Sequence, residues 1–226
     1  SVKHIIKKVN EIKPDIILIK TKTSTVKLTT NLCQKIKEKI KTKIVVIGQH
    51  ASVMPETFLY ESSPIDLCTI GEYEFTIKDI VKNLKLKNKL LNIPGIAYYN
   101  QNLVQNEKRK LIKNLDELPF PKHSLFLKPY YRTYYPIKLY KKVQWGFIMA
   151  TRGCPHNCLF CSQTLRISYG NQVRLRSVEN IIKEMKYLKE LGANAIKFVD
   201  DTFNLDLNFI QKLCKTIIKE EIEIPW

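Results

Sequence analysis

Three cysteines, Cys154, Cys158 and Cys161, lie within eight residues of each other in the segment TRGCPHNCLFCSQ. They are too close together for a disulfide framework, and their grouping is typical of a metal site in a reducing compartment. Three thiolates from one short loop can each bind one iron of a cubane [4Fe-4S] cluster, which normally takes four cysteines. The fourth iron would then be open to a small chelating ligand. The spacing therefore predicts a cluster with one exchangeable coordination position.

Zinc is the main alternative for these cysteines. Structural zinc sites usually need four ligands, often in two cysteine pairs that are well separated along the chain. His156 lies between Cys154 and Cys158, where binding to the same ion would be strained, and His50 and His123 lie in other segments without a paired partner. The donor set therefore favours the cluster over zinc.

Regular elements are expected on both sides of the cysteine loop. Residues 146–150 (GFIMA) predict a strand that leads into the loop, and Ser177 is a suitable N-cap for a helix that ends at Gly192. Residues 195–199 predict the next strand, which ends in Asp200 and Asp201, and residues 210–217 predict another helix. Two β/α units do not close a barrel, so we expect the sequence to be a fragment that stops early at its C-terminus.

The N-terminal part alternates helices and strands. Residues 2–12 and 28–40 predict helices, residues 16–19, 44–47 and 65–70 predict buried strands, and another helix begins near Tyr73. This order indicates a parallel doubly wound sheet with ligands beyond the carboxyl ends of its strands. A hairpin over residues 96–105 follows. We therefore expect domains at 1–105 and 145–226, joined by a proline-rich and tyrosine-rich linker at 106–144.

The composition limits the classes of function. The chain has 226 residues, 44% of them hydrophobic, which is enough for a core, and a formal net charge of +17. The lysines are spread along every predicted helix, so we expect solvated faces and consider specific nucleic-acid binding unlikely. No apolar run approaches the ~18 residues of a membrane span, and the N-terminus lacks a secretory signal, so we expect a cytoplasmic protein. Three lone cysteines are predicted to be small buried hydrophobic residues: Cys33, Cys68 and Cys214.

The loop GCPHNCLFC resembles the signature of the radical S-adenosylmethionine (SAM) superfamily. The segments VRLRSVENIIKEM, FVDDTFNLD, NLDELPFPKHSL, KPDIILI, VVIGQHASVMPE and DLCTIGEYE resemble the subset that carries an N-terminal cobalamin-binding domain. This resemblance covers nearly the whole chain. It implies an α/β fold, with a partial doubly wound, flavodoxin-like (Rossmann-like) domain followed by the first β/α units of a partial TIM barrel. It also implies three cofactors: a [4Fe-4S] cluster, SAM and cobalamin.

The resemblance assigns roles to residues around the cysteine loop. Cys154, Cys158 and Cys161 would bind the cluster, and Phe160 would lie beside the adenine of SAM or simply pack under the loop. Asp200 or Asp201 would accept a hydrogen bond from the amino group of SAM, although Asp201 could equally cap the next turn. Arg176 would approach a carboxylate of substrate or cofactor, or would face solvent.

For cobalamin, the loops after the first three strands match positions that surround the corrin and its nucleotide tail. The residues concerned are Thr23, Ser24, Gly48, Gln49, His50, Gly71 and Glu72. Gly48 and Gly71 suit a close approach of backbone to a ligand because they carry no Cβ. Two features depart from the family pattern: Gln49 replaces a second glycine, and the first strand and loop, which often carry a cobalt-binding histidine, are absent before Ser1.

These features together predict a radical SAM enzyme that methylates, rearranges or cyclises a small-molecule substrate with the help of cobalamin and an electron donor such as flavodoxin or ferredoxin. A methylthiotransferase acting on RNA or protein is the nearest rival, but it would need a second set of three cysteines in the N-terminal domain. A zinc-stabilised basic RNA-binding module without catalysis is a different class of alternative. The fragment could also assemble a cluster without turning over.

Overall fold

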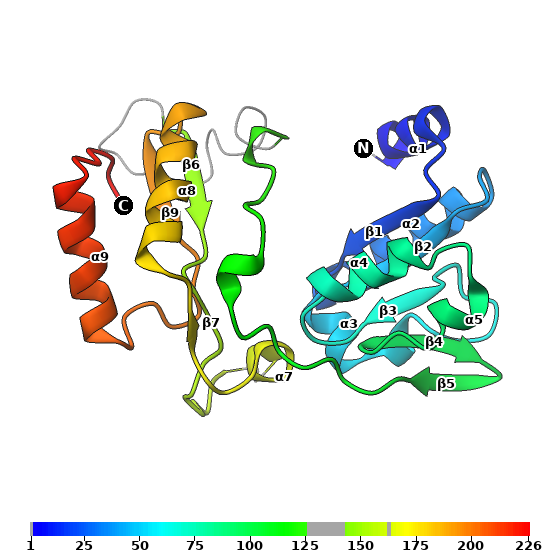
Figure 1. Cartoon of the computed structure of the whole chain (residues 1–226). Helices are drawn as coiled ribbons and strands as arrows, with labels where there is room; N and C mark the ends of the chain where they lie inside the picture. The colour runs from blue at the N-terminus through cyan, green and yellow to red at the C-terminus, as the bar shows by residue number, and fades with distance from the viewer. Residues whose placement is uncertain (1, 126–142, 162–163) are drawn as a thin grey trace. The chain divides into compact units, whose positions relative to one another are not determined.

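The computed structural model describes residues 2–125, 143–161 and 164–226, which divide into two compact units (Figure 1). The first unit contains residues 1–112 and 157–169, and the second contains residues 113–156 and 170–226. The sequence predicts boundaries near 105 and 145, whereas the structure assigns 106–112 of the expected linker to the first unit and its other described residues, 113–125 and 143–144, to the second. It also assigns 157–169, including Cys158 and Cys161, to the first unit. The remaining part of that linker, 126–142, lies outside the described residues.

The first unit is a five-stranded sheet with the order β1-β2-β3-β4-β5. The strands β1 (Ile16–Lys20), β2 (Lys43–Ile47) and β3 (Leu67–Thr69) are parallel, and the hairpin β4 (Ile96–Asn100) and β5 (Asn102–Gln105) follows, with β4 antiparallel to β3. The helices are α1 (Val2–Ile12), α2 (Val26–Lys37), α3 (Gln49–Val53), α4 (Glu74–Lys82), α5 (Lys87–Leu90) and α7 (Thr164–Tyr169). This is the predicted doubly wound arrangement.

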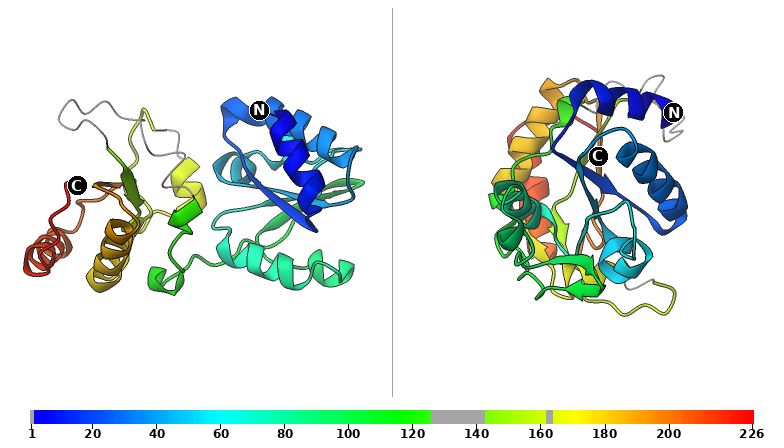
Figure 2. Two further views of the ribbon diagram at one scale, coloured as in Figure 1. Left: turned by 90° about the horizontal axis from the view of Figure 1, so that it is seen from above. Right: turned by 90° about the vertical axis from the view of Figure 1, so that its right-hand side faces the viewer.

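Alternate residues of β2 pack into two different cores, because successive side chains of a strand point to opposite faces. Ile44 and Val46 pack with residues of α2 and α3, whereas Val45 and Ile47 pack with Ile80 of α4 and other residues on that side. Figure 2 shows α1 and α2 on one side of the sheet and α4 on the other. Burial on both faces explains why the parallel strands read as continuous apolar runs.

The second unit is built on two parallel strands, β6 (Trp145–Ile148) and β9 (Ala195–Phe198), connected through α8 (Val178–Glu190) and followed by α9 (Leu207–Lys219). A two-stranded antiparallel ladder joins β7 (Thr151–Arg152) to β8 (Arg174–Leu175). One apolar core is formed between β6, β9 and the two helices, with Ile181, Met185 and Leu213 fully buried. The unit therefore contains the two predicted β/α units.

The ends of α8 follow the sequence signals. The Ser177 hydroxyl accepts a hydrogen bond from the N–H of Asn180 at 3.1 Å, and Gly192 has a φ of +92° just beyond the last turn. The short helices α3 and α7 are not predicted, because five or six residues carry too little periodicity to recognise.

In the described part of the chain, no helix is long and apolar enough to cross a membrane.

Candidate functional site

The carboxyl ends of β6 and β9 lie side by side in the second unit, and Asp200 connects them. Its Oδ1 accepts a hydrogen bond from the backbone N–H of Thr151, at the start of the segment that leads to Cys154. Its Oδ2 is buried and has no hydrogen-bond partner among the described residues. Burial raises the pKa of Asp200, and the N–H of Thr151 only partly opposes that shift. The unpartnered oxygen is the kind of acceptor that a ligand amine could satisfy.

Asp201 is more exposed than Asp200, and the desolvation of its carboxyl group by nearby protein atoms also raises its pKa above the usual value for aspartate. It does not cap α9. The capping residue is Asp206, whose Oδ1 accepts from the N–H of Phe209 at 3.0 Å. Of the two aspartates, Asp200 is therefore better placed to hold the end of β6, while a ligand contact by either remains a prediction.

Cys154 is held within the second unit by two contacts. The Thr202 hydroxyl donates to Sγ of Cys154 at 3.2 Å, and the N–H of Cys154 donates to the carbonyl of Gly170 at 3.3 Å. Gly153 immediately before it has a φ of +97°, and a Cβ there would lie 2.2 Å from the carbonyl oxygen of Gln172. Only glycine fits at this position, because any Cβ would collide with that carbonyl oxygen. The backbone conformation just before Cys154 therefore requires Gly153.

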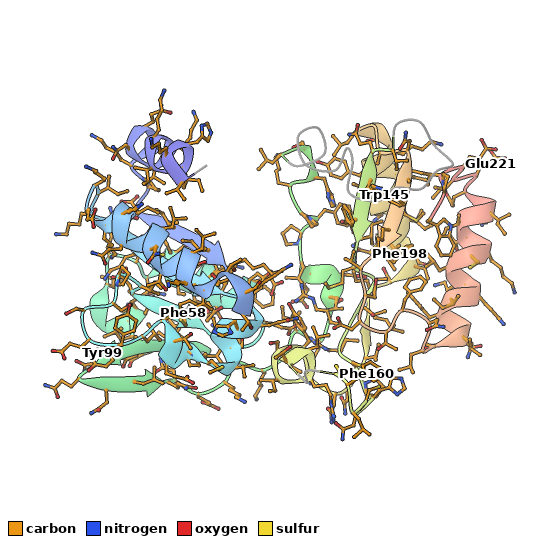
Figure 3. The ribbon with its side chains drawn as sticks, turned by 180° about the vertical axis from the view of Figure 1, so that it is seen from behind. Phe58, Tyr99, Trp145, Phe160, Phe198 and Glu221 are labelled. Carbon is orange, nitrogen blue, oxygen red and sulfur yellow. The ribbon has the colours of Figure 1, made fainter. Side chains whose placement is uncertain are left out.

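Cys158 and Cys161 are exposed within the first unit, where the N–H of Cys161 donates to the carbonyl of Cys158 at 3.1 Å. Phe160 between them is 94% exposed and points outward (Figure 3). Its alternative role, packing under the loop, is therefore wrong, and its place beside an adenine stays a prediction. An exposed apolar ring next to metal-binding residue types is available for a ligand to cover.

The donor chemistry of the loop fits an iron–sulfur cluster. Cys154, Cys158 and Cys161 are free thiols, and two of them are exposed. In the described ranges, no three His, Cys, Asp or Glu side chains already converge as a metal site. The assignment of the three cysteines therefore rests on their residue type and their spacing along the chain.

Arg176 has a different environment from either of the two predicted. It neither faces solvent nor lies open for a ligand carboxylate, because its Nη1 donates to Oε2 of Glu184 at 2.5 Å and to the carbonyl of Met149 at 3.0 Å. Glu184 is 1% exposed, and its other oxygen lies 2.7 Å from Nε2 of His123. The carboxylate partner of Arg176 is thus the protein's own. This buried Arg176–Glu184–His123 network joins the end of β6 to α8 and to the segment before residue 126, and nothing in the sequence pattern indicates it.

In the first unit, the loops after β1, β2 and β3 meet at the carboxyl edge of the sheet, as the topology predicts. His50 is buried, and its Nδ1 lies 3.0 Å from the Thr23 hydroxyl and its Nε2 3.1 Å from the Thr57 hydroxyl. The Ser52 hydroxyl donates to the carbonyl of Gly48 at 2.9 Å and accepts from the N–H of Gly71 at 3.0 Å. The residues expected around cobalamin therefore lie together, although His50 is saturated by the protein itself.

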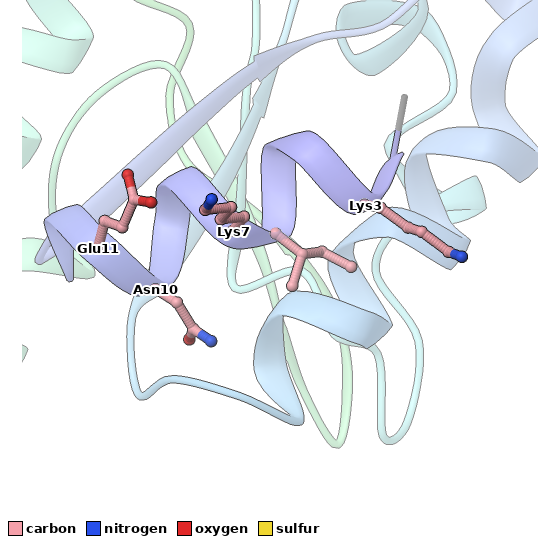
Figure 4. A pocket seen from close by; sticks show the side chains of 5 residues that line it. Lys3, Lys7, Asn10 and Glu11 are labelled. Atoms are coloured by element: carbon pink, nitrogen blue, oxygen red, sulfur yellow. The ribbon is translucent and has the colours of Figure 1, made fainter.

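The other residues predicted at this edge differ in their availability. Glu72 is buried, and its Oε2 accepts from the N–H of Ile112 at 2.7 Å. This carboxylate therefore binds the last residue of the segment 1–112 to the rest of the first unit. Gly48 and Gly71 have φ of +106° and +81°, which explains glycine at both positions without a ligand. Ser24 is exposed and Gln49 half-buried, so both are accessible. A shallow depression elsewhere in the unit is lined only by α1 (Lys3, Ile6, Lys7, Asn10 and Glu11; Figure 4), and one helix cannot enclose a ligand.

The three remaining cysteines are only partly as predicted. Cys33 and Cys68 are fully buried in the same apolar core, and burial raises the pKa of the Cys33 thiol to about 11 and that of Cys68 further. Cys214 on α9 is only half-buried, so the prediction of a buried residue is wrong there. Neither Cys33 nor Cys68 offers the exposed thiol that a second cluster would need.

Comparisons with known proteins agree with this arrangement. Residues 148–225 match the family model of the Radical SAM superfamily. An uncharacterized methyltransferase of Pyrococcus horikoshii is 35% identical over 98% of this chain and 47% of its own length. An anaerobic magnesium-protoporphyrin IX monomethyl ester cyclase of Synechocystis is 26% identical over 93% of this chain and 41% of its own length. This chain therefore spans less than half of either relative.

A solved structure of the radical SAM methyltransferase TsrM from Kitasatospora setae, with cobalamin and a [4Fe-4S] cluster bound, has a related fold. The TM-score is 0.72 at 16% sequence identity, and the match covers 97% of this chain and 43% of that one. At this identity the likeness concerns the fold, which is α/β in both units. The matched segment 148–225, which contains the last residue of β6, the cysteine loop, α8, β9 and α9, belongs to the radical SAM superfamily.

Proposed function

We propose that this chain is part of a radical SAM enzyme that uses a [4Fe-4S] cluster, SAM and cobalamin to methylate, rearrange or cyclise a small-molecule substrate. The proposal rests on two hydrogen bonds beyond the carboxyl ends of β6 and β9. Asp200 accepts from the N–H of Thr151, and the Thr202 hydroxyl donates to Cys154, the first of the three clustered cysteines. Asp200, which has a buried oxygen without a hydrogen-bond partner, therefore follows β9, and the thiol of Cys154, which would bind iron, follows the adjacent strand β6. The match to the family model supports the same assignment.

The three cysteines, Asp200 and Phe160 would bind the cluster and SAM. Cys154, Cys158 and Cys161 would bind the cluster, and Asp200 would accept a hydrogen bond from the amino group of SAM through its free oxygen. When bound, these cofactors would supply a carbon-centred radical and a methyl carrier, which protein side chains cannot provide. The exposed ring of Phe160 would cover one face of the adenine and exclude water from it.

Cobalamin is assigned to the carboxyl edge of the first unit, where the loops after β1, β2 and β3 meet. Exposed Ser24 and half-buried Gln49 would contact the ligand directly, while His50 would hold the loops in place through its two hydroxyl contacts. The related TsrM structure contains bound cobalamin, which supports the assignment. An electron donor of the flavodoxin or ferredoxin type would reduce the cluster, and a thiol-rich loop of this kind requires a reducing compartment such as the cytoplasm.

Anaerobic reconstitution of the chain with iron, sulfide and a reductant tests the cluster. We expect a brown protein with about four iron and four sulfide per chain, and loss of iron in the variant Cys158→Ala. Cys214→Ala is the matched control, because it removes a cysteine outside the loop. Colourless protein with one zinc would overturn the proposal in favour of the zinc-stabilised module.

Cobalamin binding is tested separately by the absorbance that the chain retains after gel filtration with hydroxocobalamin. Ser24→Trp fills the carboxyl edge of the sheet and should abolish retention, because Ser24 is exposed there. Lys82→Trp is the control, since Lys82 ends α4, which runs from the carboxyl edge back toward the amino edge. Equal retention by both variants would place cobalamin elsewhere. In the full-length parent, release of 5'-deoxyadenosine that stops in Cys158→Ala tests turnover itself.

A further inference from the structure

The contact between Thr202 and Cys154 bears on the electron chemistry of the loop. The Thr202 hydroxyl donates to Sγ of Cys154 at 3.2 Å, within the second unit. Hydrogen bonds to the sulfurs of an iron–sulfur cluster are one of the factors that set its reduction potential. A donor aimed at a thiolate stabilises negative charge on it, and the reduced cluster carries one more negative charge than the oxidised cluster.

The hydroxyl of Thr202 is held in place by its surroundings. The Thr202 carbonyl accepts from the Thr151 hydroxyl at 3.4 Å, and Asp200 binds the N–H of the same Thr151. On the other side, the ring of Phe203 stacks on Phe198 with ring centroids 4.5 Å apart. Thr202 lies in the loop between β9 and α9, and the contacts of Asp200, of the Thr202 carbonyl and of Phe203 hold that loop in place. The Thr202 side chain is therefore presented to Cys154 by an anchored loop.

We propose that Thr202 is a positioning residue whose hydroxyl hydrogen-bonds the Cys154 thiolate and raises the reduction potential of the cluster. This inference rests on the proposed function, because it needs a cluster on Cys154. The electron that reduces the cluster comes from an external low-potential donor, and no bond of Thr202 forms or breaks. Thr202 acts on the ease of this one-electron step through Cys154.

The test is a redox titration of the reconstituted chain, followed by the electron paramagnetic resonance signal of the reduced cluster. Thr202→Val removes the hydroxyl and keeps the shape, and we expect at least a tenfold fall in the ratio of reduced to oxidised cluster at a fixed potential. Tenfold corresponds to a potential about 59 mV lower for a one-electron couple. Thr202→Ser keeps the hydroxyl and should retain the wild-type ratio.

Two further variants make the test decisive. Thr202→Ala removes the hydroxyl without the added methyl of valine and must shift the ratio in the same direction. Thr216→Val removes a hydroxyl that donates to the Lys212 carbonyl within α9, away from Cys154, and should leave the ratio unchanged. Equal ratios in wild type, Thr202→Val and Thr202→Ala, each with full iron content, would overturn the inference while leaving the proposed function intact. Wild-type protein without iron would overturn the proposed function, and the inference with it.

Discussion

The buried carboxylate of Glu184 offers a direct test of how the second unit holds the start of the cysteine loop. Glu184 is 1% exposed and bonds both Arg176, which reaches the carbonyl of Met149 after β6, and His123. Glu184→Ala would leave the Arg176 guanidinium, 11% exposed, without its anionic partner. Removing one partner of a buried ion pair costs about 3–5 kcal/mol, mostly because the other charge stays buried and unpaired.

In a chain of this size, 1 kcal/mol shifts the midpoint of thermal unfolding by about 2–4 °C. Glu184→Ala should therefore lower the Tm by roughly 6–20 °C, which calorimetry or circular dichroism measures. Hydrogen exchange followed by mass spectrometry localises the effect: we expect faster exchange in α8 and in 115–125, and unchanged exchange in β1–β5. Arg176→Met combined with Glu184→Leu should recover part of the loss, since no unpaired charge remains.

A matched control lies on the same helix. Glu179 of α8 bonds Lys212 at 2.8 Å, but both side chains are 61% exposed, and the pKa of Glu179 is lowered chiefly by that hydrogen bond. Because exposed ion pairs contribute little, Glu179→Ala should leave the Tm and the exchange of α8 unchanged. Equal stability of the Glu179 and Glu184 variants would refute the reasoning from burial.

Three shorter predictions follow from local features. Gly153→Ala should destabilise the second unit by about 2 kcal/mol more than Gly192→Ala in urea unfolding, because both have positive φ but only Gly153 faces a carbonyl at 2.2 Å. At pH 8, maleimide should modify exposed Cys158 within minutes and leave Cys33 intact, since a pKa of about 11 leaves roughly one Cys33 thiol in a thousand ionised; equal rates would contradict the burial. Burial raises the pKa of Asp200, so the folded state binds the proton more tightly than the unfolded state. The contribution of Asp200 to stability should therefore fall as the pH rises from 3.8 through the raised pKa, so the difference in unfolding free energy between the wild type and Asp200→Asn should change in that sense in urea titrations at several pH values.

Much of the fold follows from local patterns in the sequence. Continuous apolar runs such as 44–47 predict strands buried on both faces, and Ser177 and Gly192 mark the ends of α8 where the structure has them. The helix α7 and the assignment of 157–169 to the first unit do not follow, because they depend on contacts between segments that are far apart in sequence. For α7 one such contact is the approach of the Ser168 carbonyl to Gly71.

The sequence by itself determines the donor set of this protein: three cysteines in eight residues after a strand, followed by paired aspartates after the next parallel strand. Residue type and spacing along the chain suffice for that conclusion, because a short loop with three closely spaced cysteines can bring all three thiols to one cluster. Tertiary structure alone decides which hydrogen-bonding groups of each side chain are already used by internal partners. Arg176 and Glu72 carry charge in the sequence, yet both are used by internal partners, whereas Thr202, an ordinary hydroxyl in the sequence, donates to the sulfur of Cys154. The hydrogen-bond partners of these three residues are set by neighbours brought together in space, and no local pattern encodes them.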